Sequence, residues 1–166
     1  MSRGVQTAIT ISVLCVLLAA AGLWGWSAAM KPLPAKVNTA ICVDNDVTAG
    51  DKVFPQDVAV SVYNASDREG LAGRTMQLLT DEGFAEGKSG NTQAQVAVVQ
   101  IWTLDPESPA VALVASWLGG RVEIQRRQPP GVGVAVIVGD KFDDLAKGKK
   151  AVVVRSDATI CSPPVG

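Results

Sequence analysis

The stretch Val58-Ala59-Val60-Ser61-Val62-Tyr63-Asn64-Ala65-Ser66 decides the fold class of this chain. Valine alternates with other residues as far as Tyr63, which is the periodicity of a β-strand. Ser66 and Glu69 have the spacing of a capping box, so we expect a helix to begin there and to stop at Gly83. A strand that leads directly into a helix indicates an α/β domain.

The residues that follow continue this alternation of strands and helices. The apolar segment Gln95–Thr103 predicts a central strand, and Asp105-Pro106 is expected to cap and start a second helix that ends at Gly119-Gly120. Residues 121–126 and 132–138 alternate as two further strands. The order β-α-β-α-β-β predicts a small α/β sandwich. Gly87-Lys88-Ser89 resembles the end of a P-loop, but its spacing and its place after a helix favour a plain loop.

The amino terminus predicts a membrane segment. Residues 4–30 carry no charge, and as a helix Thr7–Trp26 would be about as long as a bilayer core is thick. We therefore expect residues 1–30 to form a cytoplasmic stub and one transmembrane helix. A cleaved signal peptide is the alternative, because Ser27-Ala28-Ala29 offers a cleavage site, although the apolar run exceeds the usual length. Residues 31–36 predict a Pro-containing spacer, residues 37–161 an extracytoplasmic domain, and residues 162–166 a flexible tail.

Two cysteines lie near the ends of the predicted domain. The placement of Cys42 and Cys161 predicts a disulfide bond that ties the two ends together, which requires an oxidising compartment. Two unrelated free thiols are the alternative. Together with the membrane segment, the pair favours a single-pass protein of the cell membrane whose carboxyl-terminal domain is extracytoplasmic.

The composition excludes several kinds of site. None of the 166 residues is His, which rules out Ser-His-Asp triads, Cys-His pairs and HExxH zinc sites. The 15 basic and 16 acidic residues nearly balance, and only 5% of residues are aromatic, so we expect no nucleic-acid partner. The carboxylate pairs are sequence neighbours and do not resemble two acids across a cleft. We expect neither enzymatic activity nor a metal or cofactor.

The loop Asn64–Glu69 is the strongest candidate for a ligand site. It joins the carboxyl end of a strand to a helix start, where backbone N–H groups favour anions such as phosphate or carboxylate groups. Gly139-Asp140 also follows a strand and should lie nearby. Trp102 ends a strand, and it either stacks on a sugar or packs in the core. The candidate face comprises Asn64, Ser66, Arg68, Arg74, Trp102, Gly139 and Asp140.

A purely structural interpretation of the same loop is open. In it Asn64 adopts left-handed backbone geometry, Ser66 caps the helix, and Glu69 closes the capping box. The loop would then have no ligand.

Residues 58–145 resemble the LytR C-terminal domain family. The resemblance rests on Val60–Ser66 followed by Gly70-Leu71-Ala72-Gly73-Arg74, on Gly83-Phe84, and on the closing stretch Val136–Phe142. Tyr63 and Ala65 depart from the pattern, where the family more often has Leu and Gly.

The resemblance implies a role in the cell envelope. In many members this domain follows a LytR-CpsA-Psr domain, which transfers lipid-linked polymers to peptidoglycan, and 166 residues leave no room for it. The chain is similar to the stand-alone, single-span members of actinobacterial envelopes that are linked to envelope integrity and virulence. We expect a non-catalytic module that binds a cell-wall polymer or an envelope-assembly protein. The alternatives are a regulatory partner of the transferases and a wall-glycan enzyme that uses carboxylates alone.

Overall fold

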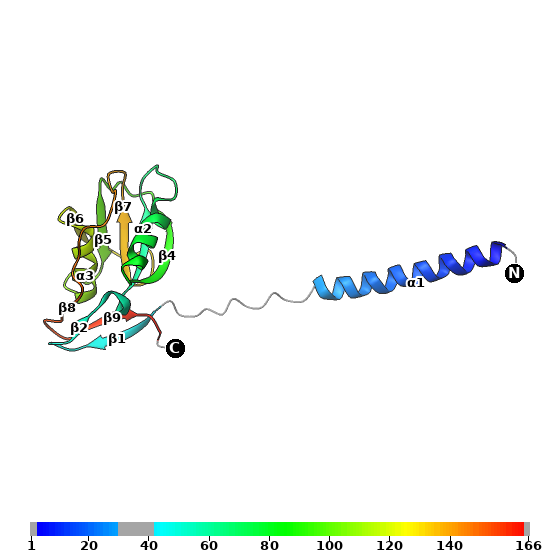
Figure 1. Ribbon diagram of the computed structural model, residues 1–166, viewed down its shortest axis with the longest axis horizontal. Coiled ribbons are helices and arrows are strands. Elements are labelled where there is room, and N and C mark those ends of the chain that lie inside the picture. Colours follow the sequence, from blue (N-terminus) through cyan, green and yellow to red (C-terminus); the bar gives the residue numbers. More distant parts are fainter. Residues whose placement is uncertain (1–2, 30–41, 165–166) are drawn as a thin grey trace. The chain divides into compact units, whose positions relative to one another are not determined.

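A computed structural model describes residues 3–29 and 42–164 of the chain, which forms two compact units, Met1–Thr39 and Ala40–Gly166 (Figure 1). The first unit holds the helix α1, Arg3–Ala29. In the part of the chain that the structure describes, no helix combines the length and the apolar character needed to cross a membrane, so the expected span is not confirmed. The Pro-containing spacer, residues 31–36, lies outside the described residues.

The second unit is built on a five-stranded sheet with the order β4-β3-β7-β5-β6. Strands β3 and β7 lie side by side in parallel at its centre, and β5 runs antiparallel to β7. The two edge strands, β4 and β6, each run parallel to their single neighbour. The bounds are Ala59–Asn64 for β3, Ala85–Asn91 for β4, Val99–Thr103 for β5, Val122–Arg126 for β6, and Val134–Val138 for β7.

Two helices, α2 (Leu71–Asp81) and α3 (Pro109–Leu118), cover one face of this sheet. Because alternate residues of a strand face the same side, Val60 and Val62 of β3 join Val136 of β7 beneath the helices. Leu79 of α2 and Leu113 of α3 are fully buried against them. The alternation that predicted strands 58–63 and 132–138 therefore reflects this one core.

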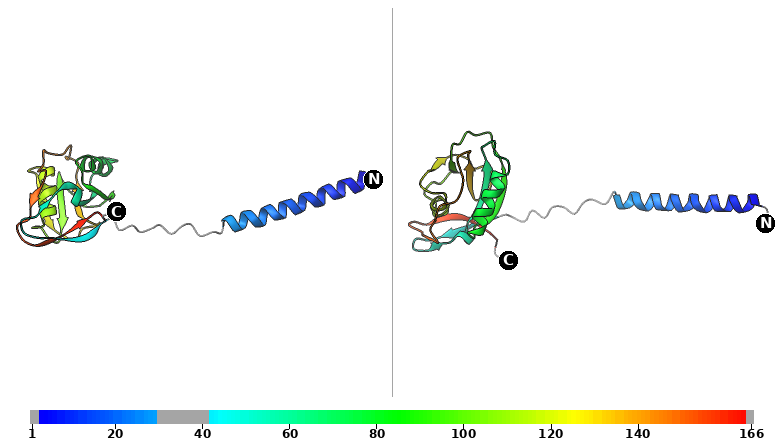
Figure 2. Two further views of the ribbon diagram at one scale, coloured as in Figure 1. Left: turned by 60° about the horizontal axis from the view of Figure 1, so that its bottom comes forward. Right: turned by 45° about the horizontal axis from the view of Figure 1, so that its top comes forward.

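The second face of the sheet is covered by loops. Tyr63, Trp102 and Ile137 point away from the helices and form a small buried cluster with Val96, which lies between β4 and β5. The segment after β6 covers the remainder, because the Arg127 guanidinium stacks over the Trp102 ring at 4.1 Å. The views in Figure 2 show the connecting loops around the sheet.

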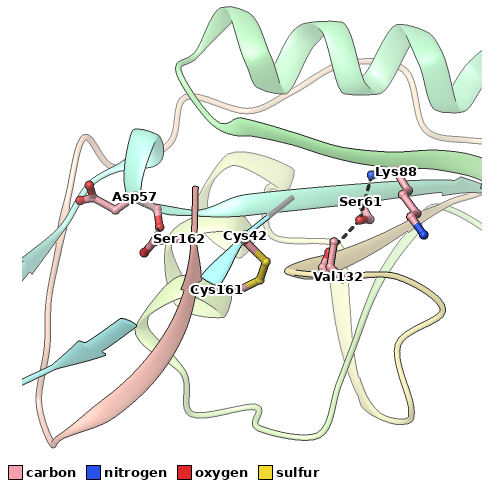
Figure 3. Close-up of a disulfide and its surroundings, with 7 residues drawn as sticks. All are labelled: Cys42, Asp57, Ser61, Lys88, Val132, Cys161 and Ser162. Carbon is pink, nitrogen blue, oxygen red and sulfur yellow. Dashed lines mark hydrogen bonds between the residues drawn. A yellow bond between two sulfur atoms is a disulfide. The ribbon is translucent and has the colours of Figure 1, made fainter. Parts of the chain in front are cut away.

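Two short pairs of strands close one end of the domain. β1 (Val43–Val47) pairs with β9 (Ala158–Ser162), and β2 (Lys52–Val53) pairs with β8 (Val152–Val153). A disulfide joins Cys42 to Cys161, with 5.4 Å between the Cα atoms, which confirms the predicted bond (Figure 3).

This end of the domain includes a residue expected in the tail. Ser162 is instead the last residue of β9, and its hydroxyl donates to the carbonyl of Asp57 at 2.7 Å. Asp57 belongs to η1, a 3-10 turn over Pro55–Asp57 that precedes β3. This hydrogen bond holds the last residue of β9 against the turn that leads into β3.

Both helices of the domain begin later than the sequence predicted. α2 starts at Leu71, after Gly70 in the left-handed region with φ of 72°. The capping-box prediction is wrong, because Ser66 uses its hydroxyl inside the preceding loop. α3 starts at Pro109 rather than at Pro106, since Asp105–Glu107 form a turn with the Glu107 amide donating to the Asp105 carboxylate.

The predicted order of elements omitted several strands. Gly87-Lys88-Ser89, expected as a loop, lies within the edge strand β4. The helix α2 therefore leads into β4, which lies next to β3. The strand predicted over 95–103 starts only at Val99. The pairs β1–β9 and β2–β8 add further strands, of which only β8 overlaps an apolar run. The α/β class is confirmed, with more strands than expected.

Candidate functional site

A groove of about 590 Å³ opens beside the carboxyl ends of β3 and β7. This is the edge of the sheet at which ligands of α/β proteins commonly bind. Three separate segments form the groove: the loop after β3, the connection from β4 to β5, and the residue two beyond β7. The lining residues are Ala65, Ser66, Asp67, Thr92, Gln93, Ala94, Gln95, Val96, Ala97 and Asp140.

The side chain of Asn64 organises the loop after β3. Its Oδ1 accepts the Ser66 amide at 3.0 Å and the Ser66 hydroxyl at 2.7 Å, and its Nδ2 donates to the Arg68 carbonyl at 2.7 Å. The Arg68 amide in turn donates to the Ser66 hydroxyl at 3.1 Å. No non-Gly residue of the described ranges has a positive φ, so the left-handed geometry considered for Asn64 is wrong. Asn64 and Ser66 thus stabilise the loop that borders the groove.

The Arg68 guanidinium ties this loop to the segment after β7. Its Nη1 donates to the carbonyls of Asp140 at 3.0 Å and Phe142 at 2.6 Å, and it lies 3.6 Å from the Asp143 carboxylate. The structure therefore brings Asn64, Ser66, Arg68 and Asp140 together, as the sequence predicted. The positive charge of Arg68 is directed at these acceptors, and Arg68 is not among the residues that line the groove.

Gly139 allows the third segment to approach closely. Its amide donates to the Val98 carbonyl at 2.8 Å, and the Lys141 amide donates to the Ala97 carbonyl at 3.0 Å. A Cβ atom at Gly139 would overlap the Val96 carbonyl. Glycine is thus required where residues 96–98 lie against the end of β7, and this contact holds one wall of the groove beside Asp140.

Two residues of the predicted face lie elsewhere. Arg74 is exposed on α2 and does not line the groove. Trp102 is only 5% exposed, its indole N–H donates to Gln100 Oε1 at 3.0 Å, and Arg127 covers its ring. Trp102 therefore packs in the second face of the sheet, which excludes the stacking role considered for it in this conformation.

The groove residues between β4 and β5 were not predicted from the sequence. Thr92, Gln93 and Gln95 line the groove, as does Asp67. The available signal was the run Asn91-Thr92-Gln93-Ala94-Gln95, which is rich in hydroxyl and amide groups and precedes the apolar residues 96–99. Its position beside the Asn64 loop follows only from the pairing of β4 with β3.

The lining has a definite chemistry. Its charged side chains are the two carboxylates of Asp67 and Asp140, and the other polar side chains are hydroxyls and amides. Carboxylates accept hydrogen bonds from hydroxyl and amine groups and repel anions, while amides both donate and accept. The groove is therefore suited to a neutral, hydroxyl-rich ligand, in contrast to the anion expected from the sequence.

Comparison with known proteins gives a family match and similar solved structures. The family described as LytR cell envelope-related transcriptional attenuator, LytR_C, matches residues 57–142. The soluble domain of a conserved hypothetical secreted protein from Mycobacterium marinum, an Rv2700 ortholog, is 24% identical with a TM-score of 0.47, over 60% of this chain and 68% of that chain. The C-terminal domain of Rv0431 is 30% identical with a TM-score of 0.35, over 66% of this chain and 98% of that domain. No curated protein matches the chain.

The family match carries the assignment. It spans more than half of the 166 residues, from the turn before β3 to Phe142 after β7. The chain belongs to the LytR_C family.

Proposed function

We propose that the domain is a non-catalytic module of the cell envelope that binds a neutral, hydroxyl-rich glycan in the groove beside β3 and β7. The LytR_C family membership supports the association with the envelope. The observation that carries the ligand class is the lining of the groove, in which Asp67 and Asp140 are joined by the side chains of Thr92, Gln93 and Gln95.

The groove offers hydrogen bonds that match a saccharide. The carboxylates of Asp67 and Asp140 can accept hydrogen bonds from hydroxyl groups, and the amides of Gln93 and Gln95 can both donate and accept. A hydrogen bond to a charged group contributes about 1.5–3 kcal/mol, so losing one lowers affinity about tenfold or more. The network of Asn64, Ser66 and Arg68 keeps the loop in place before the ligand arrives, which reduces the entropic cost of binding.

Binding of oligosaccharides of N-acetylglucosamine, the uncharged sugar of the peptidoglycan strand, to the full chain in neutral detergent tests this function. Asp140→Ala and Gln95→Ala should each weaken binding about tenfold. Asp144→Ala is the matched control, because Asp144 is an exposed carboxylate of the same segment that does not line the groove. Equal losses in Asp140→Ala and Asp144→Ala, or no binding by the unaltered chain, would refute the proposal.

We further propose that the domain is exported and stays attached to the cell membrane at its amino terminus. The disulfide between Cys42 and Cys161 supports export, since such bonds persist in oxidising compartments. The charge-free residues 4–29 support attachment. We expect the protein to stay in the membrane fraction after washing with alkaline carbonate. We also expect protease added outside intact cells to digest the domain. Recovery in the soluble cytoplasmic fraction would contradict it.

A further inference from the structure

Five cations lie around the carboxyl-terminal end of α3, and we call them the basic platform: Arg121, Lys141, Lys147, Lys149 and Lys150. All five residues are exposed. The acidic residues of the same segments are Asp143 and Asp144, and Asp143 lies 3.6 Å from Arg68. The platform therefore has an excess of positive charge.

This excess contrasts with the rest of the domain. Residues 42–164 contain 12 of the 15 basic residues and all 16 acidic ones, so the domain as a whole is negative. Within the described residues the structure has one ion pair, between Arg68 and Asp143. The cations of the platform have no carboxylate within salt-bridge distance. One cation is enough to complement the negative end of a helix dipole, so the dipole does not account for five.

The backbone of the platform is fixed on α3. The Ala146 amide donates to the Trp117 carbonyl at 2.6 Å, and the Lys149 amide donates to the Ser116 hydroxyl at 3.0 Å. The Trp117 indole N–H donates back to the Lys149 carbonyl at 3.0 Å. Gly148 lies so close to the Trp117 ring that a Cβ atom there would overlap it. The lysines therefore extend from an ordered segment, which lowers the entropy lost when they bind.

The lysines of the platform follow one another on one segment. Lys147, Lys149 and Lys150 are exposed on the stretch that is fixed on α3. The neighbouring hollow, of about 260 Å³, is lined by Arg121 and Lys141 and also by the carboxylates of Asp143 and Asp144, so its charges balance. The row of three lysines, and not this hollow, therefore suits successive charges of a linear polymer.

We propose that the basic platform binds a linear, phosphate-bearing polymer. A membrane surface is the less suitable partner, because none of the large exposed hydrophobic residues of the domain lies within 141–150 and insertion into the interface needs such side chains. The amino-terminal end of α3 lies beside β9, because Ala110 and Val111 line a hollow together with Ile160 and Cys161, and the platform lies at the other end of the helix. The site is separate from the glycan groove, and it stands without the proposed function.

The test uses the full chain in neutral detergent, with inorganic polyphosphate as the probe at about 50 mM salt, where charge–charge attraction is weakly screened. The triple variant Lys147→Glu, Lys149→Glu, Lys150→Glu should bind polyphosphate at least about tenfold more weakly. The matched control reverses Lys52, Lys88 and Arg155, three exposed cations outside the platform, and so changes the net charge equally. It should lose less than about threefold.

Three results would overturn the proposal. They are equal losses in the two triple variants, no binding of polyphosphate by the unaltered chain, and binding only to vesicles that contain about one quarter phosphatidylglycerol. Near-ultraviolet circular dichroism checks that each variant is folded. If the triple reversal does not fold, Lys147→Gln with Lys150→Gln replaces it, and an unchanged affinity then overturns the proposal. Saccharide binding in the groove should be unaffected by the platform variant, so the two proposals fail separately.

Discussion

Ser61 links three segments that lie far apart in the sequence. It is fully buried in β3, where its hydroxyl donates to the Val132 carbonyl at 2.7 Å and accepts the Lys88 amide at 3.1 Å (Figure 3). The pairing of β3 with β4 slips at this point, between Val60 and Val62. The hydroxyl therefore serves both the irregular edge strand and the loop that covers the second face of the sheet.

We predict that Ser61→Ala destabilises the domain by about 2–4 kcal/mol. The substitution removes one acceptor and one donor, and it leaves the Lys88 amide and the Val132 carbonyl without their partner. Each unsatisfied, partly buried group costs about 1–2 kcal/mol. The side chain keeps its volume almost unchanged, so a cavity contributes little to the loss.

Urea unfolding of the oxidised full chain measures the loss, and amide hydrogen exchange locates it. Exchange at the Lys88 amide should quicken in the variant more than exchange in the centre of β7. Ser89→Ala is the control, because Ser89 is an exposed serine of the same strand, and it should change stability by less than about 0.5 kcal/mol. A loss of stability below about 0.5 kcal/mol for Ser61→Ala, or unchanged exchange at the Lys88 amide, would refute this role of the Ser61 hydroxyl.

Three further predictions concern the disulfide, two glycines, and the stability of the domain at low pH. Reduction of the disulfide, or Cys42→Ser with Cys161→Ser, should lower the free energy of unfolding by about 5 kcal/mol, because the bond joins residues 119 positions apart. Urea unfolding measures this loss, and an unchanged midpoint on reduction would contradict the bond. Gly139→Ala should destabilise the domain by about 1–3 kcal/mol, because the added methyl group overlaps residues 96–98. Gly73→Ala should stabilise it by about 0.5–1 kcal/mol, because there is open space beside Gly73 on α2. Thermal unfolding compares the two variants, and equal shifts of the melting temperature would refute the packing argument. Hydrogen bonds from the Thr48 amide and hydroxyl lower the pKa of Asp51. The contribution of Asp51 to stability is therefore present above the unfolded-state pKa and is lost as the pH falls through the folded-state pKa. Asp51→Asn should reduce the loss of stability on acidification, and identical dependence of stability on pH in the two proteins would contradict this.

Much of the central fold follows from local patterns. The alternation of valine in 58–63 marks the side of β3 that faces the helices, and the largely apolar stretch 132–138 reflects β7, which is buried on both faces as β3 is. The helix predicted to end at Gly119-Gly120 does end there, after Leu118. The motif around Gly70-Leu71-Ala72 led to the LytR_C family that the comparison shows. The disulfide between the ends of the domain was also predicted from placement alone.

Other elements leave no periodic trace in the sequence. The edge strand β4, Ala85–Asn91, has mostly exposed side chains, so its strand character comes from backbone pairing with β3 and not from a buried face. The same holds for β1, whose first four residues are all exposed. Capping residues were also misjudged, because Ser66 and Asp105 have loop partners that compete with a helix start.

The sequence by itself determined the α/β class, the core strands, the disulfide pair and the family, because each depends on local periodicity, on motif residues or on placement at the ends of the domain. Only the tertiary structure decided the groove and the chemistry of its lining. Those depend on which loops meet at one end of the sheet, where Arg68 reaches the carbonyls after β7 and leaves carboxylates and amides to line the groove. The contact between Arg68 and Asp140 joins residues 72 positions apart, and the pairing of β4 with β3 brings residues 92–95 to the groove, although β4 has no periodic pattern that reveals this pairing.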